Sequence, residues 1–309
     1  MNRIKSVLKA QFGIECIDMS EIHDGLSAMN FCVKTRGQAF FLKIYDKKKP
    51  HSAQWIENIS FYMPVLSWLN ENTELRGRIA SPLKTRGGGY RFDDDENVYL
   101  LFEYIEGTSV GKSMSRPQIL EAAEIIACLH SLGCEIPFGT GKVKEDYSIP
   151  FHFSLEQLPV DVKAILQPYS ENLLSKIDEL QTLSGRIRHR DNKLVLCHTD
   201  AHGYNLMQSN RLILVDWEGL KLAPAEADLF MFSKKDYWDI FIGRYKELCP
   251  GFVLDDDILL FYILRRKLED IWEFADGIAF GNLSAEQRRR DMGFLCACLN
   301  TLDDLCFEL

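Results

Sequence analysis

The first third of the chain alternates apolar and polar side chains with a period of two, which is typical of half-buried β-strands. Two pairs of such segments are separated by short polar turns, Arg36-Gly37 in the first pair and the acidic run 93–97 in the second. Each pair is expected to form an antiparallel hairpin. The predicted strands cover residues 31–35, 38–44, 89–92 and 98–104.

A long helix is expected between the two hairpins, because apolar residues recur at helical spacing over 53–70. After Gly107 the pattern becomes mainly helical. Ser115 and Gln118 form a capping-box sequence with Pro117 in the first turn, and this helix is expected to end before Gly133. Further helices are expected at residues 4–12, 155–185, 225–248, 255–277 and 284–307.

This distribution predicts an α+β fold with two lobes. The first, residues 1–105, is a small antiparallel β lobe. The second, residues 106–309, is larger and mainly helical. A short apolar strand at 194–197 and a hairpin formed by 206–207 and 212–215 interrupt its helices.

A candidate catalytic loop follows the strand at 194–197. His198, Asp200 and Asn205 have the spacing H-x-D-x-x-x-x-N, and Asp216 ends the next hairpin. Kinase-type phosphotransferases need such a set: one carboxylate for the accepting hydroxyl, and an amide and a second carboxylate for Mg²⁺. The pattern therefore predicts phosphoryl transfer from ATP or GTP to a hydroxyl group.

Two other interpretations use the same residues. Asp, Asn and Gly between apolar strands are ordinary turn residues, although a turn does not require the complete ordered set. A His-x-Asp pair also begins the 2-His-1-carboxylate iron site of oxygenases, whose second His comes from far downstream. The last of the seven histidines is His202, on the same loop, so the iron site cannot be completed.

The β lobe is expected to provide a cation for the nucleotide phosphates. Lys43 lies near the end of an apolar strand between Leu42 and Ile44, a position where a lysine is usually a solvated edge charge. Glu57 follows on the next helix at the spacing of the Lys–Glu pair that holds a kinase ammonium toward phosphate. Glu57 is equally compatible with an exposed helical acid.

Two further nucleotide contacts are predicted from position alone. The strand end at 102–105 is expected to offer backbone groups of Glu103 and Ile105 to a purine edge. The loop 23–30 is expected to cover the phosphates through Ser27 and backbone N–H groups. This loop has one glycine rather than the three of a protein-kinase glycine loop.

Taken together, Lys43, Glu57, the loop CHTDAHGYN (197–205) and the segment VDWEGLKLAPAEADL (215–229) resemble the aminoglycoside phosphotransferase family. These are kinases of antibiotics and small metabolites with a protein-kinase-like fold. The resemblance spans nearly the whole chain and is strongest to the spectinomycin phosphotransferase branch. Two departures concern loop geometry: Thr199 stands where many members have Gly, and the phosphate loop is poor in glycine.

The resemblance implies a role for each residue of the loop. His198 would brace the loop backbone, and Asp200 would orient or deprotonate the acceptor hydroxyl. Asn205 and Asp216 would bind Mg²⁺, and Asp228 corresponds to a structural acid of the family.

An acidic helix face is the candidate site for the acceptor. Within the helix predicted around 265–276, Glu269 and Glu273 are four residues apart and Asp270 and Glu273 three apart, so they share a face. Trp272 adds an aromatic surface that an ammonium group can contact.

These residues are expected to bind the amines of a cationic acceptor opposite Asp200, because the family closes its acceptor site with C-terminal helices. The alternative is a solvated face on which the acids pair with Arg265, Arg266 and Lys267.

Composition narrows the partners. Net charge is −9 and the pI is about 5.4, which argues against a nucleic-acid binder that neutralises phosphates. An acidic surface suits a cationic small molecule, but it equally serves solubility. Nine cysteines without C-x-x-C spacing, no apolar run of about 18 residues and no secretory signal predict a cytoplasmic protein with free thiols. The oligomeric state stays open, with a monomer as the simplest expectation.

The expected activity is that of a Mg²⁺-dependent kinase that phosphorylates a hydroxyl of a small cationic molecule, such as an aminoglycoside or aminocyclitol antibiotic. One alternative is a metabolite kinase for choline, homoserine or a similar amino-alcohol. Another is a non-catalytic nucleotide-binding pseudokinase. A pseudokinase ordinarily lacks one of Lys43, Asp200, Asn205 and Asp216, and all four are present.

Overall fold

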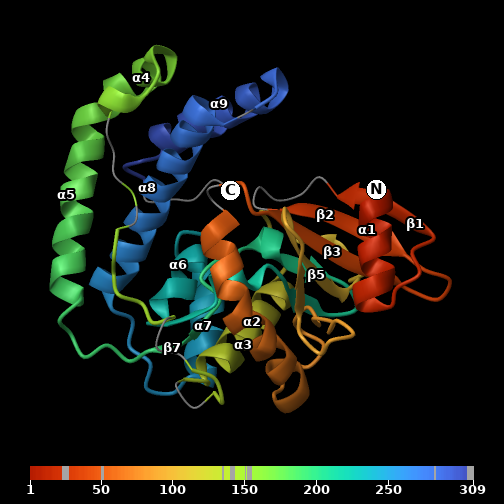
Figure 1. Cartoon of the computed structure of the whole chain (residues 1–309). Helices are drawn as coiled ribbons and strands as arrows, with labels where there is room; N and C mark the ends of the chain where they lie inside the picture. Colours follow the sequence, from red (N-terminus) through yellow and green to blue (C-terminus); the bar gives the residue numbers. More distant parts are fainter. Residues whose placement is uncertain are drawn as a thin grey trace.

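The computed structural model shows a β-sheet with its covering helices on one side of the molecule and a helical body on the other (Figure 1). The α+β fold predicted from the sequence is confirmed. The structure describes residues 1–22, 28–49, 52–133, 136–139, 143–149, 151, 155–281 and 283–304.

The sheet is antiparallel and has the strand order β1-β2-β3-β5-β4. Both predicted hairpins are confirmed, as β2–β3 and β4–β5. The strand β1 was not predicted, because its residues are mostly polar and exposed and show no alternation. The bounds are β1 Asp18–Ile22, β2 Met29–Lys34, β3 Ala39–Asp46, β4 Arg91–Asp93 and β5 Asn97–Glu103.

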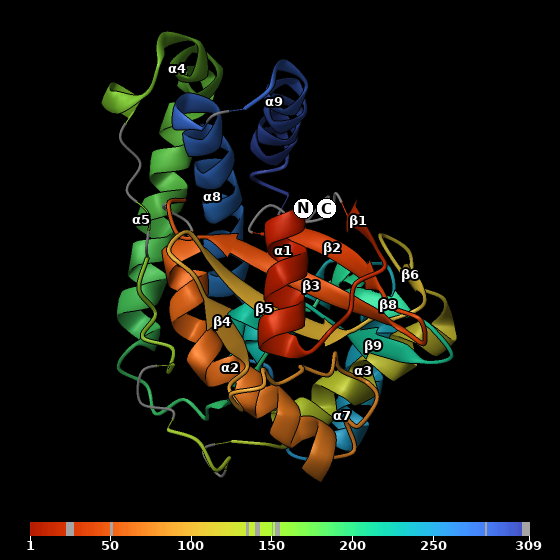
Figure 2. The same ribbon diagram turned by 45° about the vertical axis from the view of Figure 1, so that its right-hand side comes forward.

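The period of two in β3 divides its side chains between two cores. Phe40, Leu42 and Ile44 pack on one face of the sheet against Leu8 and Phe12, which belong to the N-terminal π-helical turn (Leu8–Phe12) that continues α1 (Asn2–Val7). Figure 2 shows α1 lying across this face of the sheet.

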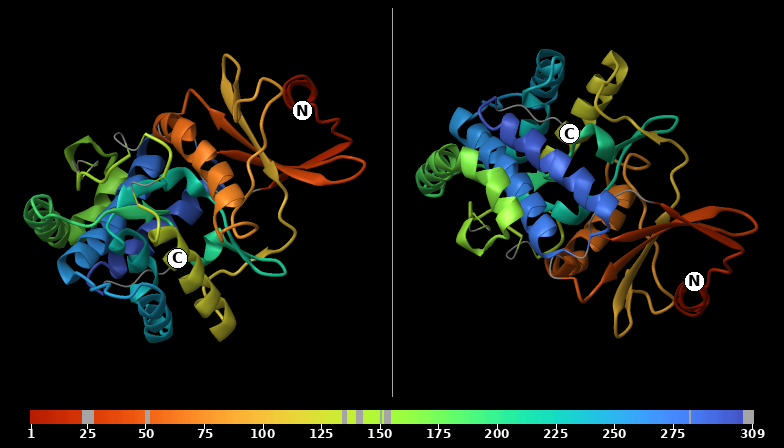
Figure 3. Two further views of the ribbon diagram at one scale, coloured as in Figure 1. Left: turned by 90° about the horizontal axis from the view of Figure 1, so that it is seen from below. Right: turned by 90° about the horizontal axis from the view of Figure 1, so that it is seen from above.

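The opposite face of the sheet is turned toward the helical body. Tyr45 packs there with Ile59 and Tyr62 of α2 (Ser52–Asn72), and Figure 3 shows α2 between the sheet and the other helices. Lys43 is two residues before Tyr45 on the same face. The alternation of β3 therefore directs this lysine toward the space between the two halves of the molecule.

The remaining helices pack as neighbouring pairs. The helix α3 contacts α7, and α8 lies between α5 and α9. The capping box predicted before α3 is present, with Ser115 N donating to Gln118 Oε1 over 2.8 Å. The bounds are α3 Arg116–His130, α4 Val160–Leu166, α5 Ser170–Ile187, α6 Glu226–Ser233, α7 Trp238–Leu248, α8 Asp256–Phe280 and α9 Ala285–Asn300.

One predicted helix is wrong in detail, since residues 225–248 form two helices rather than one. All eight residues of α6 are buried, whereas α7 buries Phe241 and Tyr245 and exposes its other face. The break at 234–237 lets α7 change direction and pack against α3. A uniformly buried helix followed by an amphipathic one looks like a single helix in sequence.

Short strands frame the predicted catalytic loop. The strand β7 (Val195–Cys197) pairs with β10 (Lys221–Ala223). The predicted hairpin is confirmed as β8 (Leu206–Gln208) and β9 (Leu212–Leu214), with β6 (Thr108–Ser109) beside β8. Within the described ranges, every helix is too short or too polar to cross a lipid bilayer.

Candidate active site

The loop between β7 and β8 and the turn after β9 lie against each other. Val215 N donates to the carbonyl oxygen of Asn205 over 3.0 Å, which brings Asp216 next to the end of the loop. His198 strengthens this contact, because its Nε2 lies 2.8 Å from Val215 O. Asp200 N donates to His198 Nδ1 over 3.2 Å. The imidazole is therefore neutral, protonated on Nε2, and holds the loop backbone.

Asp228, on α6, binds the backbone at the first residues of the loop. Its carboxylate accepts hydrogen bonds from the backbone N–H groups of His198, over 3.0 Å, and of Thr199. His130 of α3 adds a third bond from Nε2 over 2.9 Å, and Tyr245 contacts the other nitrogen of that ring over 2.8 Å. The carboxylate of α6 thus joins the loop to α3, and α7 supports α3 through Tyr245.

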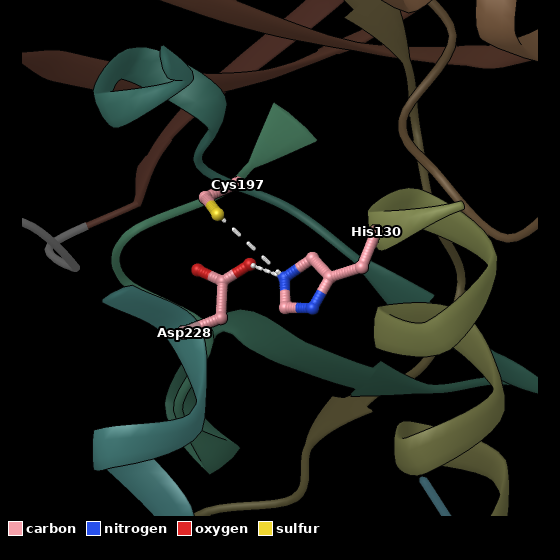
Figure 4. A group of neighbouring side chains, drawn as sticks. All are labelled: His130, Cys197 and Asp228. Atoms are coloured by element: carbon pink, nitrogen blue, oxygen red, sulfur yellow. Dashed lines mark hydrogen bonds and ion pairs between the residues drawn. The ribbon is translucent and has the colours of Figure 1, made fainter. Parts of the chain in front are cut away.

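His130, Cys197 and Asp228 come together from α3, β7 and α6 (Figure 4). All three are buried and could in principle hold a metal ion. However, both imidazole nitrogens already have hydrogen-bond partners, and the Asp228 carboxylate already accepts bonds from His130 and from two backbone N–H groups. The group is therefore a hydrogen-bonded support for the loop.

Replacing Asp228 with asparagine should lower the free energy of unfolding by about 2–4 kcal/mol, because an amide nitrogen would face buried N–H donors. Urea unfolding followed by circular dichroism measures this change. Asp236→Asn, an exposed acid just beyond the same helix, is the matched control and should shift stability by less than about 0.5 kcal/mol. Equal stability of the two variants would contradict the supporting role.

Two residues of the site have left-handed backbone conformations. Thr199 has φ 71° and Asp216 has φ 64°, values that are costly for residues other than glycine and that persist where the surroundings impose them. Thr199 Oγ1 donates to Gly219 O over 3.0 Å, which offsets part of the strain. The sequence departure at Thr199 therefore leaves the glycine-like backbone in place.

Asp200 and Asn205 contact each other directly. Asn205 Nδ2 donates to Asp200 Oδ2 and to Asp200 O, both over 2.9 Å. With the amide nitrogen turned toward Asp200, the amide oxygen of Asn205 is left for another partner. Burial works against ionisation of Asp200, but the guanidinium of Arg266 and the adjacent His202 hold the pKa of this carboxyl well below its ordinary range.

Lys43 joins the sheet to this site. Its side chain is 5% exposed, and its ammonium donates to Asp216 Oδ1 over 3.0 Å and to Glu218. Tyr45 also donates to Glu218. Burial opposes the charged form, but these two carboxylates raise the pKa of Lys43 well above its ordinary value. The lysine is therefore a permanent cation at the boundary between sheet and helices.

Lys43 has partners other than the predicted Glu57 in this structure. In the part of the chain that the structure describes, no ion pair links the two, and Glu57 is exposed. Successive helical residues are rotated by about 100°, and α2 turns Asn58 rather than Glu57 inward. Asn58 donates to the backbone oxygens of Glu218 and Leu220.

The other predicted nucleotide contacts lie at and just after the end of β5. Glu103 is the last residue of β5, and its N–H donates to Ser81 O over 3.0 Å. Ile105 is half-buried against the larger core, and its N–H donates to no other backbone group of the described residues. Ser27 and most of the predicted phosphate loop lie outside the described residues.

The acidic face of α8 lies beside Asp200, but arginines of the same helix already pair with Glu269 and Asp270. Arg266 Nη1 donates to Asp200 Oδ1 over 2.9 Å, and Arg266 Nε donates to Asp270 Oδ1 over 2.8 Å. Arg265 lies 3.7 Å from Glu269. Among the other predicted acceptor residues, Glu273 is exposed, and Trp272 is half-buried against the core. The pairing with Arg265 and Arg266 that the sequence left as an alternative is therefore present for two of the acids.

Two residues of the site were not found from the sequence. Glu218 binds Lys43, and Arg266 binds Asp200. A signal existed for each: Glu218 is a carboxylate two residues after a predicted metal ligand, and Arg266 neighbours the acidic face. Neither signal shows which distant residue is contacted.

A family model described as the phosphotransferase enzyme family matches residues 18–247. The chain belongs to this family. The match includes every residue of the loop and turn described above. No curated protein matches the chain significantly.

Solved structures of kinases share the fold of this phosphotransferase. Spectinomycin phosphotransferase APH(9)-Ia, in complex with ADP and spectinomycin, has a TM-score of 0.74 at 18% identity, with 98% of each chain covered. A microcompartment-associated aminopropanol kinase has a TM-score of 0.68 at 13% identity, covering 98% of this chain and 96% of its own. A macrolide 2'-phosphotransferase from Brachybacterium faecium has a TM-score of 0.58 at 14% identity, covering 97% and 98%.

Proposed function

We propose that this enzyme is a Mg²⁺-dependent kinase that transfers the γ-phosphoryl group of ATP or GTP to a hydroxyl of a small cationic molecule. One observation carries the proposal. Asp200, Asn205, Asp216 and Lys43 form one chain of contacts, which joins Asp200–Asn205 hydrogen bonds to the Lys43–Asp216 ion pair through the Val215–Asn205 backbone bond. A hydroxyl-orienting carboxylate, hard oxygen ligands and a phosphate-binding cation are thus adjacent.

The reaction needs each of these groups. The acceptor oxygen forms a bond to the γ-phosphorus while the bond from that phosphorus to the ADP oxygen breaks. The hydroxyl proton passes to the Asp200 carboxylate and then to solvent. Because the transition state of such transfers is loose, positioning of the hydroxyl contributes more than proton removal, which agrees with an Asp200 held as a weak base.

The residues present suit Mg²⁺. Asn205 has its amide oxygen available, and Asp216 has a half-exposed carboxylate, so the donor set consists of oxygens as a hard cation requires. Glu218 is a further carboxylate beside them. When bound, the ion would neutralise charge on the nucleotide phosphates. Lys43 would contact the phosphates from the sheet side.

The nucleotide would lie between the two lobes, residues 1–105 and 106–309. Glu103 and Ile105 at the end of β5 would offer backbone groups to the purine, and Ser27 would belong to the loop over the phosphates. Solved structures of APH(9)-Ia contain ADP or AMP, and their shared fold supports this placement.

The charge around α8 supports a cationic acceptor. The carboxylates that interact with Arg265 and Arg266 outnumber the cations there. The carboxylates are those of Glu145, Asp200, Glu269, Asp270 and Glu273, and the cations are Lys221, Arg265 and Arg266. Burial also raises the pKa values of Glu269 and Asp270 above their ordinary range. An ammonium group entering this region would stabilise the charged carboxylates.

A second candidate is an amino-alcohol that also carries an anionic group. A hollow beside the catalytic loop is lined by Lys112 and Lys235 together with His202 and Gly203 of that loop. An ammonium toward α8 and an anion toward these lysines would orient a zwitterion such as homoserine.

The decisive experiment combines thermal shift with ADP release over a panel of spectinomycin, aminoglycosides, choline, homoserine and 1-amino-2-propanol. A true acceptor at 100 times its Kd should stabilise the fold by about 2.7 kcal/mol and should release ADP in the presence of Mg²⁺. Nucleotide binding without turnover on any acceptor would instead support a non-catalytic nucleotide-binding protein.

Replacing Glu273 with glutamine should raise the acceptor KM by roughly two- to fivefold, since exposed ion pairs contribute about 0.2–1 kcal/mol. The nucleotide KM should not change. Steady-state kinetics with the acceptor found by the panel measures both values. Glu286→Gln, an exposed acid on α9, is the control. An unchanged acceptor KM would remove Glu273 from the acceptor site.

A further inference from the structure

Arg266 reaches the catalytic loop from a helix 66 residues further along the chain. Its guanidinium makes two directed contacts, Nη1 to Asp200 Oδ1 over 2.9 Å and Nε to Asp270 Oδ1 over 2.8 Å. Asn205 binds the other carboxylate oxygen of Asp200 over 2.9 Å. The carboxylate is therefore held at both oxygens by donors from two different elements.

The contacts of Arg266 differ from those of a surface ion pair. Its side chain is 26% exposed, and that of Asp270 is 12% exposed. Both belong to the same face of α8 with i, i+4 spacing, so Asp270 pre-orients the guanidinium before it meets the loop. Exposed pairs with two mobile partners lack this support.

The helix is anchored at the same turn by the preceding residue. Arg265 binds the buried Glu145 through two bonds of 3.1 Å, and its guanidinium lies over the rings of Phe261 and Tyr262 at 5.0 and 4.9 Å. Arg265 thus fixes the position of α8, and this position places Arg266 within reach of Asp200.

The loop has little else to hold Asp200 on this side. Within the described residues, His202 also approaches this carboxylate, with Nε2 at 3.5 Å from Oδ1. The distance exceeds that of a good hydrogen bond. Without Arg266, Oδ1 of Asp200 would keep only the longer contact with His202, and the carboxylate would be held less firmly in its orientation.

We propose that Arg266 is a positioning residue for phosphoryl transfer: fixed by Asp270, its guanidinium holds the Asp200 carboxylate in the orientation that receives the acceptor hydroxyl. This inference rests on the proposed function. A carboxylate oxygen accepts more than one hydrogen bond, so Oδ1 can bind the hydroxyl while it remains bound to Arg266. Asp270 accordingly acts through Arg266, and the acceptor amine is left to Glu269 and Glu273.

The first test compares Arg266→Met, Arg266→Lys and Arg266→Ala with the wild-type enzyme, using Mg²⁺-ATP and water, spectinomycin or 1-amino-2-propanol as acceptors. Arg266→Met should lower kcat by roughly 10²-fold, the usual effect of misplacing a reacting group, with the nucleotide KM unchanged. Lysine cannot make both bonds of the planar fork, so Arg266→Lys should recover a part of the loss.

Chemical rescue separates positioning from a general structural role. Guanidinium chloride at a non-denaturing concentration should raise the kcat of Arg266→Ala at least tenfold over its value without the salt. The same salt should not change the activity of Arg244→Ala, the matched control, which removes an arginine bridging Glu124 and Glu247. Full activity of Arg266→Met, or no rescue of a folded Arg266→Ala, would overturn the inference.

A double-mutant cycle distinguishes failure of this inference from failure of the proposed function. The effects of Arg266→Met and Asp200→Asn on the unfolding equilibrium constant should be non-additive by a factor on the order of ten. Additive effects would overturn the inference even in an active kinase. Coupled effects in an enzyme that turns over neither water nor any acceptor would support the Arg266–Asp200 link and overturn the proposed kinase activity alone.

Discussion

Replacing Asp200 with alanine should lower kcat by roughly 10²–10⁴-fold, the usual size of a general-base or hydroxyl-orienting contribution. The affinity for nucleotide should stay nearly unchanged, because the proposed phosphate-binding Lys43 and the proposed metal ligand Asn205 are also held by other residues. Lys43 binds Asp216 and Glu218, and the backbone of Asn205 is fixed by Val215. Single-turnover kinetics and a fluorescent-nucleotide titration measure the two quantities separately.

Asp200→Asn is the matched variant. Its amide keeps the size of the side chain but loses the charge that orients a hydroxyl proton, so its kcat should fall nearly as far. Since the Asn205 amide would then face another amide, a small rise in the Mg²⁺ requirement is also expected. Near-normal turnover by either variant would remove Asp200 from the mechanism.

Replacing Asp216 with asparagine should weaken Mg²⁺-dependent nucleotide binding by at least 10- to 100-fold, the loss seen even for groups that merely support a metal ligand. A neutral amide cannot replace the charge that holds a hard cation. The loss should not arise from backbone strain, because asparagine tolerates the left-handed conformation of this residue as aspartate does. The ion pair of Lys43 would also shift entirely to Glu218.

The measurement is a nucleotide titration with Mg²⁺ and again with EDTA. Wild-type affinity should depend strongly on the metal, whereas the affinity of Asp216→Asn should be low in both conditions. Glu57→Gln is the control, since Glu57 is exposed and has no ion pair to Lys43 among the described residues. An unchanged metal dependence in Asp216→Asn would refute its proposed role.

Spacing along the sequence was sufficient where the residues of the site are close in the chain. Asp200 and Asn205 lie on one loop, and a short hairpin returns Asp216 to it, so local structure alone brings them together. Lys43 was found from the alternation of β3, which gives every second side chain the same face.

Contacts between distant elements could not be obtained in this way. Glu218 is 175 residues from Lys43, and no local pattern shows that it replaces an acid of α2. A rotation of one residue in α2 decides whether Glu57 or Asn58 faces inward, and helix boundaries are rarely known that well from sequence. The contact of Arg266 depends on where α8 lies over the loop, which follows from packing rather than from the acidic pattern of the helix.

The close approach of Thr199 to Gly219 has a consequence for substitutions at this site. A Cβ atom at residue 219 would collide with Thr199 Oγ1 and would lie 3.0 Å from His198 O. With threonine at 199, residue 219 has no room for a side chain. Glycine at 199 would remove the collision with the hydroxyl and leave only the tight contact with His198 O. The side chains of residues 199 and 219 would therefore compete for the same space. A substitution of Gly219 by alanine should therefore destabilise the fold less when residue 199 is glycine than when it is threonine.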